Sequence, residues 1–188
     1  SRFPAIHTIE VGNEFNGGNF VRGPLQKAGG PERAAAHVAI LKAIAEGLPG
    51  DRPVRVLGGA AHSIPAAYLW AILDGGGADY MDALVIHPYT TRAEEFSDQI
   101  GVLRRHPLAR DMPIEVTEFG TPDPDDAPAF VFRWLAVMAV NGVERAVWFP
   151  LNPRGGEVPM IPLEGRDGNL TMAGRAYAFA GKMLGGQE

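Results

Sequence analysis

Five short apolar segments, each followed by a helical pattern, set the strongest limit on how this chain of 188 residues can fold. The expected strands span 7–11, 54–57, 83–87, 114–117 and 146–149, and the expected helices span about 31–48, 64–73, 93–105, 127–141 and 172–184. Strands that alternate with helices of this length are joined by right-handed crossovers, so neighbouring strands run parallel. Because the strands are rich in Val, Ile and Leu, both faces of the sheet are expected to be buried. The pattern predicts an α/β fold.

Composition narrows the class of protein further. With 46% hydrophobic and 21% charged residues, one globular domain over residues 1–188 is expected. The net charge of -5 argues against nucleic acid or an anionic membrane surface as a partner. The longest apolar stretch, about 127–140, contains Arg133 and is too short to cross a bilayer. The lack of cysteine excludes disulfides and thiolate metal sites.

The segments between these elements carry fewer signals. The glycines at 58–59 and 75–77 are expected to form turns, because no lysine of a phosphate-binding loop accompanies them. Ser63 is the expected N-cap of the helix that follows it. A long loop is expected over 151–170, and a hairpin around 155–156 is one way for it to turn.

Two of the expected strands end alike, in a glutamate followed by an aromatic residue and a turn former. Glu14 closes the run 9–16, and Glu118 closes the run 113–120. The carboxyl ends of parallel strands meet at one edge of the sheet, where α/β proteins build their sites. Two carboxylates facing one cleft are the minimum equipment for acid–base or nucleophilic chemistry on a glycosidic bond.

The other strands bring polar or aromatic groups to the same edge. Together with the two glutamates, the strand ends carry Asn13, Gly58, Gly59, His62, His87, Tyr89, Trp148 and Asn152. Chance can place one or two such residues there, but all five strands contribute, and this indicates a site.

This arrangement resembles the clan-A retaining glycoside hydrolases, the (β/α)8-barrel (TIM-barrel) enzymes that include cellulases, mannanases, β-xylosidases and arabinofuranosidases. The resemblance rests on Asn13-Glu14, His87-x-Tyr89, Glu118 and Trp148, and on the tail 163–171 followed by 176–179. It implies that Glu14 is the acid/base at the end of barrel strand 4 and that Glu118 is the nucleophile at the end of strand 7. As acid, Glu14 is expected to have a raised pKa.

The resemblance also implies roles for four neighbours, each with a structural alternative. Asn13 would hold a sugar 2-hydroxyl, or only form a turn. Tyr89 would hydrogen-bond Glu118 and keep it ionised, or only pack. His87 would contact sugar hydroxyls or tune a carboxylate, or only be a satisfied polar group. Trp148 would stack under a sugar ring, or belong to the core.

Two further glutamates compete with the chosen pair. Glu10 and Glu14 are evenly spaced, so on a continuing strand they would share a face, whereas Glu115 and Glu118 would point oppositely. Periodicity alone leaves the choice open, and the resemblance selects Glu14 and Glu118.

The resemblance covers only the barrel from strand 4 to strand 8. A full barrel has eight strands and about 250 residues, so strands 1 to 3 are missing. The chain is then expected to be a fragment, one half of a split protein, or a half-barrel that completes itself by association. Exposed sheet edges favour self-association or a second chain.

The leading functional prediction is a retaining glycoside hydrolase acting on a poly- or oligosaccharide without a cofactor. This substrate class slightly favours a secreted or periplasmic location. One alternative is a non-catalytic half-barrel that binds carbohydrate or serves assembly. Another is a metal-dependent sugar isomerase with a cation on His87, Glu14 and Glu118, although no HExxH motif supports it.

Overall fold

The computed structural model describes residues 5–48, 54–153 and 160–184, and it contains five strands that alternate with five α-helices. The strands are β1 (Thr8–Glu10), β2 (Arg55–His62), β3 (Ala83–His87), β4 (Ile114–Phe119) and β5 (Val143–Trp148). The α-helices are α1 (Gly30–Gly47), α2 (Ala66–Asp74), α3 (Ala93–Leu103), α4 (Ala127–Val140) and α5 (Met172–Leu184). Short 3-10 helices cover Gly23–Gln26, Gly77–Tyr80 and Pro107–Ala109.

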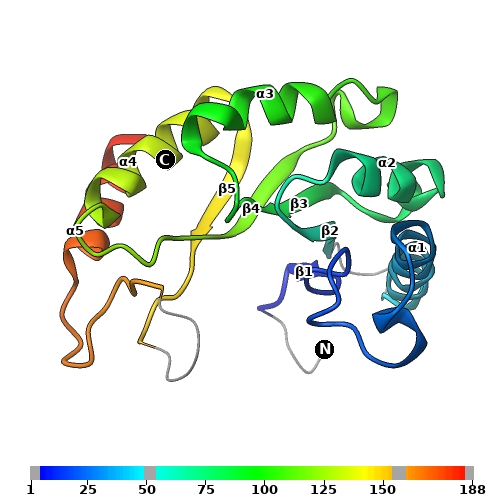
Figure 1. Ribbon diagram of the computed structural model, residues 1–188, viewed down its shortest axis with the longest axis horizontal. Helices are drawn as coiled ribbons and strands as arrows, with labels where there is room; N and C mark the ends of the chain where they lie inside the picture. The colour runs from blue at the N-terminus through cyan, green and yellow to red at the C-terminus, as the bar shows by residue number, and fades with distance from the viewer. Residues whose placement is uncertain (1–4, 49–53, 154–159, 185–188) are drawn as a thin grey trace.

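The sheet has the order β1-β2-β3-β4-β5, and every pairing is parallel. Figure 1 shows the helices following one another along the outer side of the curved sheet, from α1 near one end to α5 near the other. The predicted α/β fold with a partial TIM barrel is confirmed. Since β1 and β5 end the strand order, each has one edge without a neighbouring strand among the described residues.

The two faces of the sheet differ in what covers them. On the outer face, apolar strand residues such as Leu84, Ile86 and Val116 are fully buried in the core that the helices complete. On the inner face, Leu57 and Val85 belong to a small apolar cluster of their own. Strand alternation produces both faces, because side chains of successive residues point to opposite sides.

Around this small cluster, the inner face is polar and partly open. Glu115, buried in β4, pairs with Arg55 at 2.6 Å, and Arg145 lies 3.8 Å from its other carboxylate oxygen. The side chain of Arg145 is 52% exposed, and Val147 on the same face of β5 is 41% exposed. The half-barrel therefore leaves part of its concave surface uncovered at β5.

Some local expectations were wrong. The glycines at 58–59 lie inside β2, where the register against β3 shifts, and not in a turn. A bulge of this kind accommodates an extra residue and explains the positive φ of Gly59. Pro65, not Ser63, occupies the N-cap position of α2. The hairpin expected around 155–156 falls outside the described residues. In the part of the chain that is described, no helix is both long and apolar enough to cross a membrane.

Candidate active site

Glu14 lies just after β1 in a backbone conformation that L-residues rarely adopt, with φ of 47°. Its backbone N–H donates to the Ala60 carbonyl at 2.6 Å, so the bulged part of β2 holds this turn. Asn16 adds two bonds to the backbone of His62, one donated and one accepted, both of 2.9 Å. Such strain costs on the order of 1–3 kcal/mol and persists where neighbours enforce it, as these hydrogen bonds do.

Glu118 reaches the same region from β4 because that strand is irregular. The register of β4 against β5 shifts between Val116 and Phe119. Regular alternation would send Thr117 and Glu118 to opposite faces, yet both have side-chain atoms near the ring of His87. Glu115 lies deeper in the sheet, fully buried and paired with Arg55, so it does not compete for the site.

His87, at the end of β3, is fully buried and links these groups. Its Nδ1 lies 3.2 Å from Glu14 Oε1 and 3.9 Å from Glu118 Oε2. Its Nε2 lies 3.0 Å from Thr117 Oγ1 and 3.4 Å from Glu10 Oε1. Three carboxylates therefore surround one imidazole.

The charges in this cluster shift two pKa values. Burial alone would lower the pKa of His87, but the contacts to Glu10 and Glu14 and the charge of Glu118 raise it to about 9. Burial tends to raise the pKa of Glu14, but hydrogen bonds from His87 and His62 outweigh it, so this pKa is lowered. The expected raised pKa of Glu14 is thus not found in the free protein, because two imidazoles stabilise its ionised form.

Tyr89 follows β3 and donates a hydrogen bond of 2.9 Å to Glu118 Oε2. Burial raises the pKa of Tyr89, and the charge of Glu118 raises it further, so the hydroxyl keeps its proton. The ring of His62 stacks beside Tyr89 with centroids 6.4 Å apart, and His62 Nδ1 lies 3.3 Å from Glu14 Oε1. These contacts place aromatic rings next to both carboxylates.

The structure brings together four of the six expected site residues. Glu14, Glu118, His87 and Tyr89 form one connected cluster. Asn13 is half-buried beside Glu14, and its contact with a sugar stays a prediction. Trp148 is 4% exposed and packs against Phe119 and Phe130, and its stacking under a sugar ring stays a prediction.

Three polar contributors were not predicted as site residues. Glu10 was considered only as a rival to Glu14, and its even spacing from Glu14 was the signal that both share a face. Thr117 gave no signal, because a bulge is needed to bring it beside the neighbouring glutamate. Asn16 pairs with the backbone of His62 and so helps to hold the turn that carries Glu14.

Three side chains of the cluster also lie close enough together to bind one cation. One ligand atom from each of Glu14, His87 and Glu118 lies within 4.8 Å of the other two. We assign no metal to this cluster.

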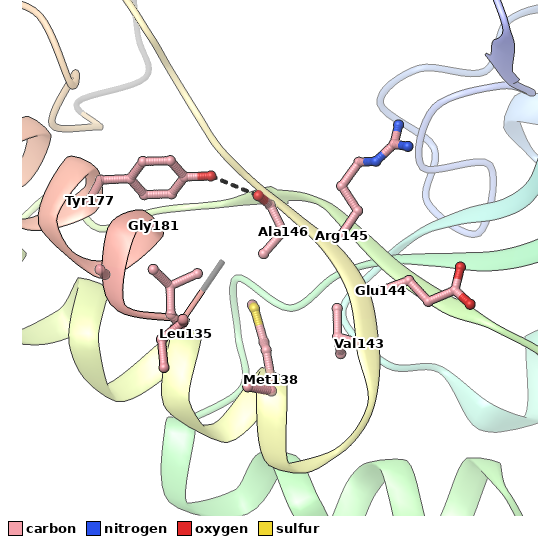
Figure 2. A pocket seen from close by; sticks show the side chains of 11 residues that line it. Leu135, Met138, Val143, Glu144, Arg145, Ala146, Tyr177 and Gly181 are labelled. Atoms are coloured by element: carbon pink, nitrogen blue, oxygen red, sulfur yellow. Dashed lines mark hydrogen bonds between the residues drawn. The ribbon is translucent and has the colours of Figure 1, made fainter. Parts of the chain in front are cut away.

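A separate pocket lies between α4, β5 and α5 (Figure 2). Leu135, Met138, Val143 and Ala146 line it, and the Tyr177 hydroxyl donates to the Ala146 carbonyl at 2.7 Å. The pocket has a volume of about 200 Å³ and a mostly apolar lining. None of Glu10, Glu14 and Glu118 borders it. Its ionisable lining residues interact elsewhere, Glu144 with Arg55, Arg145 with Glu115 and Tyr177 with the Ala146 carbonyl, so they do not converge as the groups of an active site do.

Comparison with known proteins supports the fold assignment. The sequence matches no protein-family model and no curated protein. Among solved structures, it is similar to a monomeric beta-xylosidase from Caulobacter crescentus CB15, with TM-score 0.61 and 18% identity over 90% of this chain and 40% of that one. It is also similar to a GH39 enzyme from Xanthomonas axonopodis pv. citri, with TM-score 0.67 and 17% identity over 96% and 42% of the two chains.

A third similar structure is an exo-beta-1,4-mannosidase from Opitutaceae bacterium strain TAV5, with TM-score 0.59 and 17% identity over 92% of this chain and 35% of that one. The chain spans about two fifths of the length of these glycoside hydrolases. At this identity the likeness shows the fold alone: the chain has part of a (β/α)8 barrel, the architecture of these glycoside hydrolases.

Proposed function

We propose that this chain carries the catalytic carboxylates of a retaining glycoside hydrolase. The observation that carries the proposal is the convergence of Glu14 and Glu118, which lie with His87 in a cluster whose ligand atoms are within 4.8 Å of one another. Retaining enzymes hold their carboxyl groups about 5–5.5 Å apart, and inverting enzymes about 6.5–9.5 Å. The close approach of the two carboxylates favours the retaining arrangement. The similar structures are named as a xylosidase and a mannosidase, which supports a glycoside as the substrate.

The two glutamates take different roles in this proposal. The Glu118 carboxylate attacks the anomeric carbon while the bond to the leaving oxygen breaks, and Glu14 gives that oxygen its proton. Glu14 then takes a proton from water, whose oxygen attacks the anomeric carbon and releases Glu118. Tyr89 donates to Glu118 Oε2 and holds it in place. This chemistry needs no cofactor.

Hydrolysis of aryl β-glycosides tests the proposal directly. A 2-fluoro glycoside should leave a covalent adduct on wild-type protein, and peptide mass spectrometry should locate it on Glu118. Glu118→Gln should lose both hydrolysis and adduct while retaining sugar binding. Glu95→Gln, on the first turn of α3, is the matched control. An adduct on another residue would contradict the role of Glu118.

The partial barrel supports a second candidate, a non-catalytic half that binds carbohydrate or serves assembly. Its support is the uncovered concave surface at β5, where the side chain of Arg145 is 52% exposed and Val147 is 41% exposed. Sugar binding without any hydrolysis by wild-type protein would favour it. A sugar isomerase would instead show activity that a chelator removes.

We also propose that the open sheet associates, either with itself or with a second chain. Within the described part of the chain, β1 and β5 each have one edge with no neighbouring strand, and another strand can pair with such an edge. Light scattering after size exclusion should then give a mass above 20.1 kDa. A stable monomer at all concentrations would contradict self-association.

A further inference from the structure

Glu10 is placed to act on His87, the imidazole that the carboxylates of the cluster share. It ends β1, and its carboxylate lies 3.4 Å from Nε2 of His87, on the side of the ring opposite Glu14. Carboxylates only accept hydrogen bonds. With acceptors facing both ring nitrogens, a lone pair on either nitrogen would point at a negative charge.

We propose that Glu10 is a positioning residue that keeps a proton on Nε2 of His87, so that the Nδ1 proton is the one offered to Glu14. This inference rests on the proposed function, in which Glu14 must be protonated when the glycosidic bond breaks. Thr117 Oγ1, 3.0 Å from Nε2, supports the same orientation of the ring.

The consequence is a defined source for the catalytic proton. Transfer from His87 Nδ1 to Glu14 Oε1, across 3.2 Å, breaks one N–H bond and forms one O–H bond. The imidazole left behind is neutral and keeps its remaining proton on Nε2, which lies 3.0 Å from Thr117 Oγ1 and 3.4 Å from the Glu10 carboxylate. Glu14 is thereby neutral while Glu118 stays ionised. This resembles the way a carboxylate fixes the histidine tautomer in a catalytic triad.

The charged and titratable groups around His87 come from every strand near it. Glu10 and Glu14 come from β1 and the turn that follows, and Glu118 from β4. His62, at the end of β2, faces Glu14, and Tyr89 bonds Glu118. Of these, Glu10 alone is a carboxylate that faces Nε2 and not Nδ1.

Nitrogen-15 NMR of the His87 ring tests the inference without any need for hydrolysis. Wild-type protein should show both ring nitrogens protonated at pH 7, with loss of one proton near pH 9. Glu10→Gln keeps an acceptor but removes the charge, and the midpoint should fall by roughly one pH unit. Thr117→Val keeps the charge and should move it less. Glu46→Gln, at an exposed position in the last turn of α1, is the matched control.

Two results would overturn the inference. One is a wild-type ring with an unprotonated Nε2 at pH 7, which needs no variant and so holds even if Glu10→Gln fails to fold. The other is a folded Glu10→Gln protein whose His87 midpoint equals that of wild type.

A kinetic readout separates this inference from the proposed function. The alkaline limb of kcat/KM on an aryl β-glycoside should move to lower pH in Glu10→Gln by the same amount as the NMR midpoint, with KM nearly unchanged. A uniform loss of rate at every pH would indicate a merely structural role and contradict the inference. If no form hydrolyses the glycoside, the proposed function fails, while the NMR titration still decides the role of Glu10.

Discussion

His37 and His87 are both fully buried, yet their surroundings drive them to opposite charge states. His37 lies on α1 against the sheet, where its Nε2 accepts the Gly59 N–H at 3.1 Å, and its buried Nδ1 has no hydrogen-bond partner among the residues that the structure describes. Burial lowers its pKa to about 4. Burial acts on His87 in the same direction, but neighbouring carboxylates raise its pKa to about 9.

The difference shows that depth in the fold does not decide the charge of a histidine. Between helix and sheet, the ring of His37 has apolar neighbours such as the edge-on ring of Phe15, so the neutral form persists. On the inner face of the sheet, His87 has carboxylates on both sides. At the interface between α1 and the outer face of the sheet, His37 is a neutral hydrogen-bond acceptor. On the inner face of the sheet, His87 is a buried cation.

Removal of His87 should have the largest effect on stability. His87→Leu leaves Glu10, Glu14 and Glu118 without their shared cation, and loss of one partner of a buried pair costs roughly 3–5 kcal/mol. Urea unfolding at pH 6 measures this loss. His106→Leu, at a ring 12% exposed and paired with Asp74, is the control and should cost less. Equal stability of wild type and His87→Leu would show that the carboxylates need no counter-charge.

The pH dependence of stability should run in opposite directions for the two rings. His37 has a folded pKa of about 4, below the unfolded value of about 6.5, so the unfolded chain binds the extra proton between them. Stability then falls as pH drops through this window, by at most about 1.4 kcal/mol per pH unit. His87 has a raised folded pKa, so its stabilisation is complete below pH 6.5 and lost as pH rises through about 9.

Subtraction of variant curves isolates each contribution. The free energy of unfolding of wild type minus that of His37→Leu should decline from pH 6.5 to 4. The corresponding difference for His87→Leu should decline from pH 6.5 to 9. Two differences that slope the same way with pH would overturn the contrast between the two sites.

Replacement of His37 at neutral pH should have a smaller effect. His37→Leu leaves the buried Gly59 N–H without an acceptor, which costs on the order of 1–3 kcal/mol. His37→Gln can restore an acceptor and should recover part of the loss. Thermal unfolding at pH 7.5 measures both variants. If the glutamine and leucine variants are equally stable, the hydrogen bond to Gly59 contributes nothing.

The sequence allowed more of the fold to be predicted than of the site. All five strands and helices were expected, because apolar periodicity and glycine breaks follow local rules. The carboxylates Glu14 and Glu118 could be chosen by resemblance. The lowered pKa of Glu14 could not be predicted, because it depends on the rings of His62 and His87, which belong to β2 and β3. Thr117 beside Glu118 depends on a bulge that no alternation pattern reveals.

The smallest predicted effect concerns the link between the two regions, which passes through the bulge in β2. Gly59 has φ of +96°, and an added Cβ would lie 2.9 Å from the Val85 carbonyl oxygen, so Gly59→Ala must shift the bulge. That shift should weaken the bond from Gly59 to His37 and move the Ala60 carbonyl that holds Glu14.

A double-mutant cycle measures this link. Gly59→Ala already weakens the hydrogen bond from this amide to His37, so His37→Leu should destabilise that variant less than it destabilises wild type. The coupling energy between the two substitutions should be about 0.5–1 kcal/mol. The same cycle with Gly101→Ala, whose added Cβ meets nothing within 4 Å, should give no coupling. Full additivity in the Gly59 cycle would mean that the neutral histidine and the bulge that holds Glu14 are independent, and that the outer interface has no influence on the site.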